Sequence, residues 1–405
     1  MNRQRIVRAL NDNRLAAVVA TAPENINYAV AYEGLDGPWR RDGKAAIIPA
    51  SDSTPISVVA GSEVGFMLRA GVDQRATLYR FGPLPRGLDS SDELSHRFEQ
   101  IARARNSGTL AEAIIAALKG SEVSGGRVAV DETGSPEVLR MLREVESDYE
   151  FLSHGNDVLA LGRMVKSADE IDLLRRASAV NEAGIQAVLA VAADLDSSEI
   201  ERLHRTVIAS LGGLHLHFQM GVGASGFQHA GGSPSRFAGV NRWKPRRPAT
   251  GSVVFWDAAL SLDGYISDLG GTYSIREPAS DGDIRMYSAL EAGIQTGLEH
   301  AQPGVRASKF REVVLESVRQ AGAPEYSGAA GHGVGTAHHE FPLLRGPMKT
   351  SSPFLPNPFD PELEVGMVLA IEITPPGLQD EVICAVTHEG GRLLSRRREL
   401  VVVGA

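Results

Sequence analysis

Two aspartates flank a strong turn signal in the stretch FWDAALSLDGYISDLGGTY, residues 255–273. The dipeptide Asp263-Gly264 favours a tight hairpin turn between two strands. Asp257 and Asp268 then lie roughly across from each other on one side of the antiparallel pair, about 5 Å apart. Carboxylates at that distance repel each other unless a cation lies between them or one is protonated. The hairpin alone is equally compatible with two aspartates in contact with solvent.

Three more acid–base side chains interrupt apolar or glycine-rich stretches closer to the C-terminus. His332 lies among glycines in GHGVGTAHHE, Glu372 lies inside the apolar stretch MVLAIEITPPG, and Glu381 begins another in QDEVICAVTHEGG. A buried carboxylate is costly without a partner. Carboxylates together with one imidazole suit divalent Mn, Fe, Co or Zn, and shared carboxylates suit a two-metal site. The neighbouring His338 is interpreted as structural.

The elements that must position these residues belong to two predicted domains, because 405 residues are more than one core usually serves. Residues 1–155 alternate helical patterns with short apolar strands such as AAVVAT and KAAIIPA, which is typical of an α/β layer domain. From residue 156 to 405, helices alternate with strands and glycine-rich loops in an α+β pattern, beginning with a capping box at Ser167 and Glu170. Further helices are expected over 197–211, 281–301 and 307–321.

Composition limits the partners and the compartment. The formal net charge of −9 argues against nucleic acid or an anionic membrane as the main partner. The single cysteine, Cys384, cannot form an internal disulfide, which fits a reducing compartment. The sequence has no signal-peptide pattern and no apolar run near 18 residues, so we expect a cytoplasmic protein without a membrane span.

The carboxylates and the glycine-flanked histidine, in this order, resemble the metal-binding set of the pita-bread superfamily. That superfamily includes methionine aminopeptidase, aminopeptidase P, prolidase and creatinase. The stretch RALNDNRLAAVVATAPENINYAVAY resembles the start of a creatinase-type N-terminal domain, and MVKSADEIDLLRRAS resembles the first helix of the catalytic domain. The resemblance implies a creatinase-like α/β domain over 1–155 and an α+β pita-bread catalytic domain over 156–405. An N-terminal domain of this size excludes the short methionine aminopeptidases.

The resemblance also implies two divalent metal ions, with manganese expected first and cobalt, zinc or iron as alternatives. Asp257 would hold one ion, and His332 and Glu372 would hold the other. Asp268 and Glu381 would bridge the ions. A hydroxide between the ions would be the nucleophile, and Glu372 would also handle the proton.

Further histidines match those that flank the scissile group in the family. His229, in GASGFQHAG, and His339 would stabilise the developing oxyanion or donate a proton to the leaving group. The alternative for each is a loop histidine that faces water. His215 and His217 alternate on an expected strand, and no role beyond lining the site or packing is assigned to them.

Several positions depart from the peptidase pattern. Gly271 stands where the family often has arginine, Ile373-Thr374 where it often has Pro-Gly, and Gln379 where prolyl-specific members often have arginine. All five ligand positions are present, so the departures concern the substrate more than the metal. The leading hypothesis is a metallohydrolase of a peptide or amide bond, similar to Xaa-Pro peptidases, acting on a short peptide or small molecule. The alternatives are an amide or amidine hydrolase, a β-elimination lyase such as a dimethylsulfoniopropionate lyase, and a non-catalytic binding protein.

The resemblance also predicts a homodimer in which the N-terminal domain of one subunit borders the active site of the other. The loop YEGLDGPWRRDGK, residues 32–44, is a candidate for that contact. It carries Trp39, Arg40 and Arg41, residue types favoured at interfaces and carboxylate-binding sites. An exposed hairpin tip is the alternative interpretation.

Overall fold

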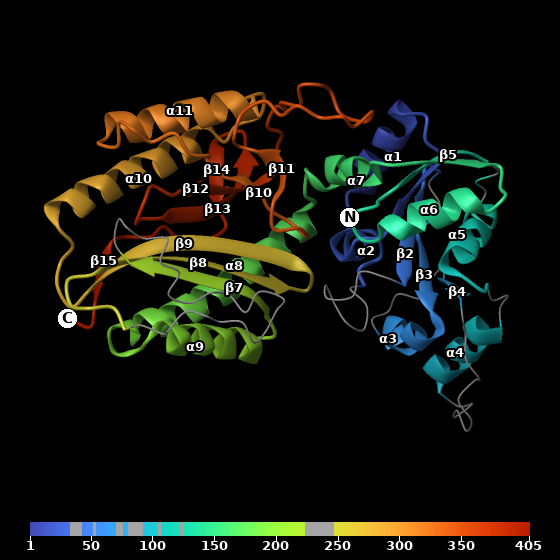
Figure 1. The fold of residues 1–405 in the computed structure, drawn as a ribbon, viewed down its shortest axis with the longest axis horizontal. Helices are drawn as coiled ribbons and strands as arrows, with labels where there is room; N and C mark the ends of the chain where they lie inside the picture. The colour runs from blue at the N-terminus through green and yellow to red at the C-terminus, as the bar shows by residue number, and fades with distance from the viewer. Residues whose placement is uncertain are drawn as a thin grey trace. The chain divides into compact units, whose positions relative to one another are not determined.

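The computed structural model describes residues 1–32, 43–51, 54–69, 76–79, 92–103, 107–121, 123, 125–222 and 247–405. These residues divide into two compact units (Figure 1). Unit 1 comprises Met1–Arg163 and Thr350–Pro356, and unit 2 comprises Met164–Lys349 and Asn357–Ala405. The predicted boundary at residues 155/156 falls at the start of helix α7 (Gly155–Arg163), which belongs to unit 1. Over the described ranges, none of the helices combines the length and the apolar character that crossing a bilayer requires.

Unit 1 is built on a mixed sheet with the strand order β4-β3-β2-β1-β5-β6. The strands are β1 (Ala17–Ala20), β2 (Lys44–Pro49), β3 (Ile56–Ala60), β4 (Ala76–Tyr79), β5 (Gly126–Val130) and β6 (Tyr149–Leu152). The helices besides α7 are α1 (Arg3–Asp12), α2 (Pro23–Val30), α3 (Val64–Arg69), α4 (Glu93–Arg103), α5 (Leu110–Lys119) and α6 (Pro136–Glu144). Alternate residues of β1 enter different cores: Val19 packs with α5 and α6, and Val18 packs with α1, α2 and α7. Unit 1 is therefore a layered α/β domain, as predicted.

Unit 2 contains α8 (Ala168–Leu189), α9 (Ser197–Ser210), α10 (Asp281–His300) and α11 (Ala307–Gln320). The predicted helices and the capping box of Ser167 and Glu170 are confirmed. One sheet, the aspartate sheet, has the order β15-β9-β8-β7, with β7 (Leu214–Val222), β8 (Val253–Leu262), β9 (Tyr265–Ile275) and β15 (Val401–Val403). Another, the glutamate sheet, has the order β11-β10-β12-β13-β14, with β10 (His332–Gly333), β11 (Glu340–Leu343), β12 (Val368–Ile373), β13 (Asp380–Thr387) and β14 (Gly390–Leu393).

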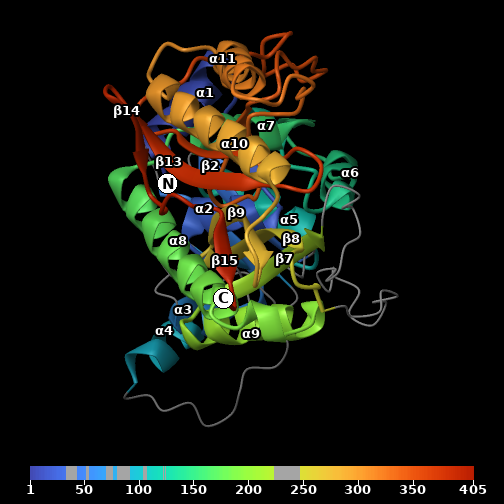
Figure 2. The same cartoon turned by 90° about the vertical axis from the view of Figure 1, so that its left-hand side faces the viewer.

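These elements form layers that place the sheets of unit 2 face to face. Helix α10 covers the glutamate sheet, α8 and α9 cover the aspartate sheet, and β9 contacts β13 between them (Figures 1 and 2). The sheets are joined by hydrogen bonds between Thr272 and Gln379, in which each residue donates once, and by the Ile266 N–H donating to the Gly335 carbonyl at 2.8 Å. Side chains on the inner faces of the sheets therefore meet.

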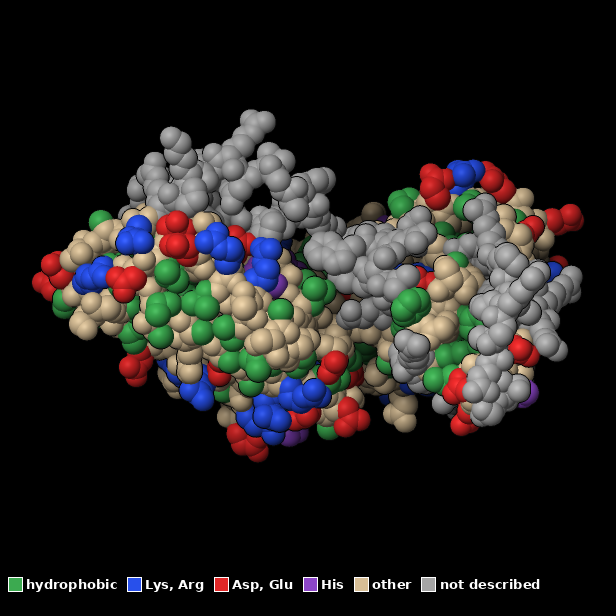
Figure 3. All heavy atoms as spheres, turned by 90° about the horizontal axis from the view of Figure 1, so that it is seen from below, with side chains coloured by type: hydrophobic (Ala, Val, Ile, Leu, Met, Phe, Trp, Pro, Cys, Tyr) green, Lys and Arg blue, Asp and Glu red, His purple; other side chains and the backbone are tan. Residues whose placement is uncertain are grey.

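Charged side chains of both signs are interspersed on the described part of the surface seen in Figure 3. Many belong to pairs along one helix, such as Arg175 with Asp172 on α8 and Lys309 with Glu312 on α11. Exposed pairs of this kind contribute little to stability, about 0–1 kcal/mol each.

Candidate metal centre

The β8–β9 hairpin closes through a two-residue turn at Asp263 and Gly264, whose φ angles are 51° and 79°. This turn pairs Asp257 with Gly270 and Asp268 with Ala259. Asp257 and Asp268, expected roughly across from each other and about 5 Å apart, are therefore two positions out of direct opposition, because the turn fixes the register. Directly paired residues share a face, so the two aspartates are diagonal neighbours on the same face of the sheet.

The directly opposed carboxylates of the site are instead Glu372 on β12 and Glu381 on β13. Like charges in that arrangement are destabilising. One oxygen of Glu381 lies within 4.8 Å of oxygens of both Asp257 and Asp268, so the glutamate sheet and the aspartate sheet contribute to one cluster. Ligand atoms of His332, Glu372 and Glu381 are equally close to one another. The structure thus brings together all five residues of the predicted ligand set.

Glycines on both sides of His332 let the backbone approach β11 and β12. Gly331 has a φ of 116°, and a Cβ there would lie 1.9 Å from the carbonyl oxygen of Ala370. At Gly333, a Cβ would lie 2.4 Å from the carbonyl oxygen of Phe341. The His332 Nδ1 lies 2.9 Å from the Gly333 carbonyl, so this nitrogen carries the proton and donates it. The lone pair is then on Nε2, which faces Asp268 at 3.5 Å.

The pKa values of the carboxyl groups reflect how closely the acidic side chains of the cluster lie to one another. Burial, Asp257 and Asp268 together raise the pKa of Glu372 to about 7. Burial and the same aspartates raise the pKa of Glu381 well above its ordinary value. Burial also opposes ionisation of Asp268, but His338, His217 and His332 outweigh it and lower the pKa of that carboxyl. The site therefore favours added positive charge, which protons or metal ions can supply.

Several buried polar atoms of the cluster have no hydrogen-bond partner among the residues that the structure describes. They are Asp268 Oδ1, both carboxylate oxygens of Glu381, and His332 Nε2. Buried polar atoms are normally paired, and hard oxygens with one imidazole nitrogen are the donors that divalent transition metals bind. These residues therefore fit the two divalent ions that the sequence predicts.

His217 also reaches the cluster, although no feature of the sequence distinguishes it from His215. A β-bulge in β7 shifts the register between them, so that His215 pairs with Leu260 and His217 with Ala259. The two histidines consequently lie on opposite faces of the aspartate sheet. His215 packs against His204 of α9, whereas the His217 Nε2 lies 2.8 Å from Asp257 Oδ1.

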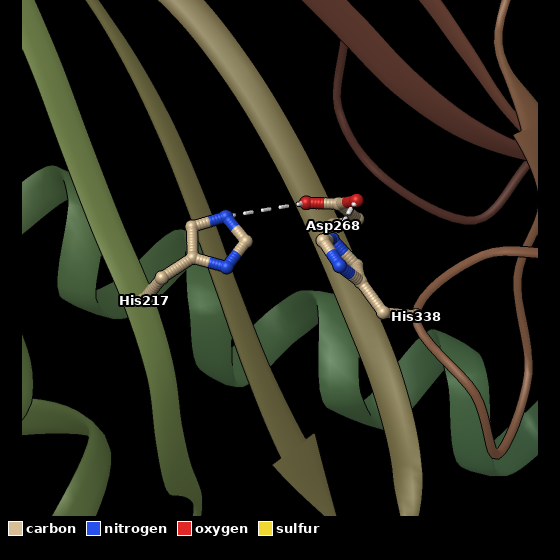
Figure 4. Close-up of side chains that lie close together, drawn as sticks. All are labelled: His217, Asp268 and His338. Carbon is tan, nitrogen blue, oxygen red and sulfur yellow. Dashed lines mark ion pairs between the residues drawn. The ribbon is translucent and has the colours of Figure 1, made fainter. Parts of the chain in front are cut away.

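His338 was predicted to be structural, but it points at the carboxylates. Its Nε2 lies 2.5 Å from Asp268 Oδ2 (Figure 4). Despite burial, the charge of Asp268 raises the pKa of His338 to about 9. The next residue, His339, lies with its ring centre 4.1 Å from that of His332. Burial and these two neighbouring histidines lower the pKa of His339 to about 4. No periodicity in the sequence indicates that adjacent residues of one loop both turn inward.

Two of the positions that depart from the peptidase pattern surround Glu372. The Thr374 hydroxyl donates to Glu372 Oε1 at 3.0 Å, and the Gln379 side-chain amide donates to the same oxygen at 3.3 Å. A Cβ at Gly270 would lie 2.5 Å from the Gln379 amide nitrogen, so this glycine makes room for Gln379. His229, the other predicted catalytic histidine, lies outside the described residues, as do Trp39, Arg40 and Arg41.

Comparisons with known proteins agree with this architecture. A model of metallopeptidase family M24 matches residues 172–401. A probable dipeptidase PepE of Mycobacterium tuberculosis is 30% identical over 234 residues, 55% of this chain and 57% of that protein. An Xaa-Pro dipeptidase of Lactobacillus delbrueckii subsp. lactis is 27% identical over 232 residues, 56% of each chain. The chain thus spans a little over half the length of these curated relatives.

Solved structures resemble the chain over its whole length. Dipeptidase PepE from Mycobacterium ulcerans has a TM-score of 0.71 at 24% identity, covering 99% of this chain and 97% of that one. Prolidase from Pyrococcus furiosus has a TM-score of 0.67 at 17% identity, covering 97% of this chain and 100% of that one. These likenesses confirm the predicted fold, an N-terminal α/β domain followed by a pita-bread domain. The family match over more than half of the sequence shows that the chain belongs to metallopeptidase family M24.

Proposed function

We propose that the chain hydrolyses a peptide or amide bond of a short substrate, in the manner of an Xaa-Pro dipeptidase, with two divalent metal ions. The observation that carries this proposal is the meeting of Asp257, Asp268, His332, Glu372 and Glu381, with unpartnered donor atoms directed at one another. Manganese is the first candidate, followed by cobalt, zinc and iron.

In the proposed centre, Asp257 would hold one ion, and His332 and Glu372 would hold the other. Asp268 and Glu381 would be shared between the ions. Ions held in this way would polarise a carbonyl group and lower the pKa of water so that a hydroxide is available near neutral pH.

The protein's own groups carry the remaining steps. Glu372 would take the proton of the attacking water and pass it to the leaving nitrogen. Thr374 and Gln379, which both donate to Oε1, hold its carboxyl group in place. His339 lies beside the cluster, where it can donate a hydrogen bond to the developing oxyanion. The matching role of His229 stays a prediction.

Two features bear on the substrate. Relatives named dipeptidase and Xaa-Pro dipeptidase favour a dipeptide. Gln379, however, is neutral where prolyl-specific members often carry arginine, and its amide group is directed at Glu372 rather than left for a substrate carboxylate. This second observation keeps a small amide or amidine hydrolase, and a β-elimination lyase of dimethylsulfoniopropionate, as alternative activities.

A metal-defined activity screen tests the proposal. Metal-free protein is reloaded with Mn²⁺, Co²⁺, Zn²⁺ or Fe²⁺ and offered Xaa-Pro dipeptides, other dipeptides, acyl amino acids, small amidines and dimethylsulfoniopropionate. We expect hydrolysis of dipeptides with at least one of the metals. Turnover of an amidine or of the sulfonium acid alone would replace the peptidase assignment by the corresponding alternative.

Variants of the bridging residues test the metal centre separately. Asp268→Ala and Glu381→Ala should each abolish activity and reduce the bound metal measured by mass spectrometry, because each removes a bridge. Glu316→Ala, which changes an exposed carboxylate on α11, is the matched control and should bind metal as the unchanged protein does. Full metal occupancy in both bridge variants would contradict the assignment.

We also propose a cytoplasmic homodimer. Residues 33–42 of the predicted contact loop, 32–44, lie outside the described residues. Replacing Arg40 and Arg41 with alanine should raise KM for an anionic substrate and leave the metal content unchanged. An active monomer in sedimentation would refute the proposal that the loop of one subunit contributes to the active site of the other.

A further inference from the structure

His217 and His338 both approach the aspartates of the cluster. The His217 Nε2 lies 2.8 Å from Asp257 Oδ1 and 4.0 Å from Asp268 Oδ1. The His338 Nε2 lies 2.5 Å from Asp268 Oδ2. Figure 4 shows both imidazoles directed at Asp268, one from β7 and the other from the loop that follows β10. One donor atom each of His217, Asp268 and His338 therefore lies within 4.8 Å of the others.

The fold fixes both imidazoles in this position. The bulge in β7 turns His217 away from His215 and onto the face that carries Asp257, and its side chain is only 12% exposed. The loop of His338 is held by Glu340, which accepts the Ala337 N–H at 3.0 Å. The His217 and His338 ring centres are 5.0 Å apart. A bulge in one strand and an anchored loop thus hold two imidazoles beside one carboxylate, in an arrangement that could bind a metal ion.

We propose that His217 and His338 are metal ligands, which together with Asp268 bind the ion on the Asp257 side of the centre. Donor atoms bound to one ion at about 2.0–2.2 Å lie at most about 4.4 Å apart, so atoms within 4.8 Å of one another need only a small shift to share an ion. The set of Asp257, Asp268, His217 and His338 offers both nitrogen and oxygen donors. This inference rests on the proposed metal-dependent function, to which it adds ligands.

The added imidazoles affect the relative affinities of the centre for divalent metals. Carboxylates and water suit Mn²⁺, whereas imidazole suits Zn²⁺, Fe²⁺, Cu²⁺ and Ni²⁺. Together with His332, the described residues then supply an imidazole donor to both ions. Sites of nitrogen and oxygen donors already bind Co²⁺ and Zn²⁺ more tightly than Mn²⁺, and we expect the added imidazoles to widen that difference for the ion beside Asp257.

The test uses His217→Gln and His338→Gln, with His300→Gln on helix α10 as the matched control. Metal-free full-length proteins are titrated with Co²⁺ against a chelator, and the visible absorption of bound Co²⁺ is recorded. Loss of a residue that only orients a ligand costs about 10–100-fold in metal affinity. Loss of a ligand should therefore weaken one of two Co²⁺ ions by at least about 100-fold and change the absorption spectrum, and Mn²⁺ affinity should fall less.

A measurement on the unchanged protein covers the case in which a variant does not fold. With one equivalent of Cu²⁺, pulsed electron paramagnetic resonance should detect two imidazole nitrogens on the ion. Two Co²⁺ ions bound by both variants with unchanged affinity and spectrum, or a single imidazole on Cu²⁺, would overturn the ligand assignment but leave the proposed function standing. Three ions in the unchanged protein and two in the double variant would also overturn it, in favour of a separate third site. An unchanged protein that binds no divalent ion would instead refute the proposed function itself.

Discussion

Lys166 and Glu340 form a buried ion pair behind the loop that carries His338 and His339. The Lys166 Nζ lies 2.9 Å from Glu340 Oε2, and each side chain is only 1% exposed. The other oxygen of Glu340 accepts the Ala337 N–H, so the pair connects the chain segment before α8 to the metal-site loop. Loss of this ion pair should therefore reduce both the stability of the fold and the affinity for metal.

Lys166→Met removes the cation and keeps a chain of similar length. It leaves the Glu340 carboxylate buried without its ammonium partner, and breaking a buried pair in this way costs about 3–5 kcal/mol. With a slope of about 3 kcal/mol per M of urea, the unfolding midpoint should fall by about 1–1.7 M. The double variant Lys166→Met with Glu340→Gln removes both charges and should recover much of that loss.

Urea unfolding of the metal-free proteins, followed by circular dichroism, measures these changes. The control is Lys309→Met, because Lys309 forms an exposed pair with Glu312 on α11 and its loss should cost less than about 1 kcal/mol. The reasoning is refuted if Lys166→Met destabilises no more than this control, or if the double variant is no more stable than Lys166→Met. A lower affinity for Co²⁺ in Lys166→Met than in the control would show that the pair also holds the loop.

Gly331→Ala should reduce bound metal and destabilise the protein, because its Cβ would lie 1.9 Å from the Ala370 carbonyl oxygen. Gly282→Ala, in the first turn of α10, should instead stabilise the protein by up to about 1 kcal/mol. Metal analysis and urea unfolding compare the two variants. Burial, with smaller contributions from His215 and His217, lowers the pKa of His204 to about 3. Because this folded-state pKa lies below the unfolded value of 6.5, the contribution of neutral His204 to stability is complete above pH 6.5 and is lost as the pH falls toward 3. Between pH 7 and pH 5, the free energy of unfolding of His204→Gln should therefore fall by about 2 kcal/mol less than that of the unchanged protein. Urea unfolding at the two pH values measures this, and an equal fall in both proteins would contradict it.

Local signals predicted most of the scaffold. The helices of unit 2 were predictable because capping residues and apolar periodicity act within a few residues of one another, as at Ser167 and Glu170. The turn at Asp263 and Gly264 was also predictable, although the register that it imposes was misjudged by two positions.

The remaining features of the site depend on distant parts of the chain. The bulge that separates His215 from His217 arises from the pairing of β7 with β8 and leaves no mark in the alternating pattern HLHF. His338 faces Asp268 because its loop is anchored by Glu340, whose partner Lys166 is 174 residues away. The arrangement of Glu372 opposite Glu381 likewise depends on how β12 and β13 pair.

The aspartate sheet and the glutamate sheet each supply part of the ligand set, and these parts come from segments more than 60 residues apart in the chain. An ion shared between Asp268 of β9 and Glu381 of β13 would connect the sheets directly, so its binding free energy would be added to the free energy that holds them together. Metal loading should then slow amide hydrogen exchange most in β9 and β13, far more than in the helices on the outer faces. In such a protein, metal supply would set the lifetime of the folded chain as well as its rate of turnover.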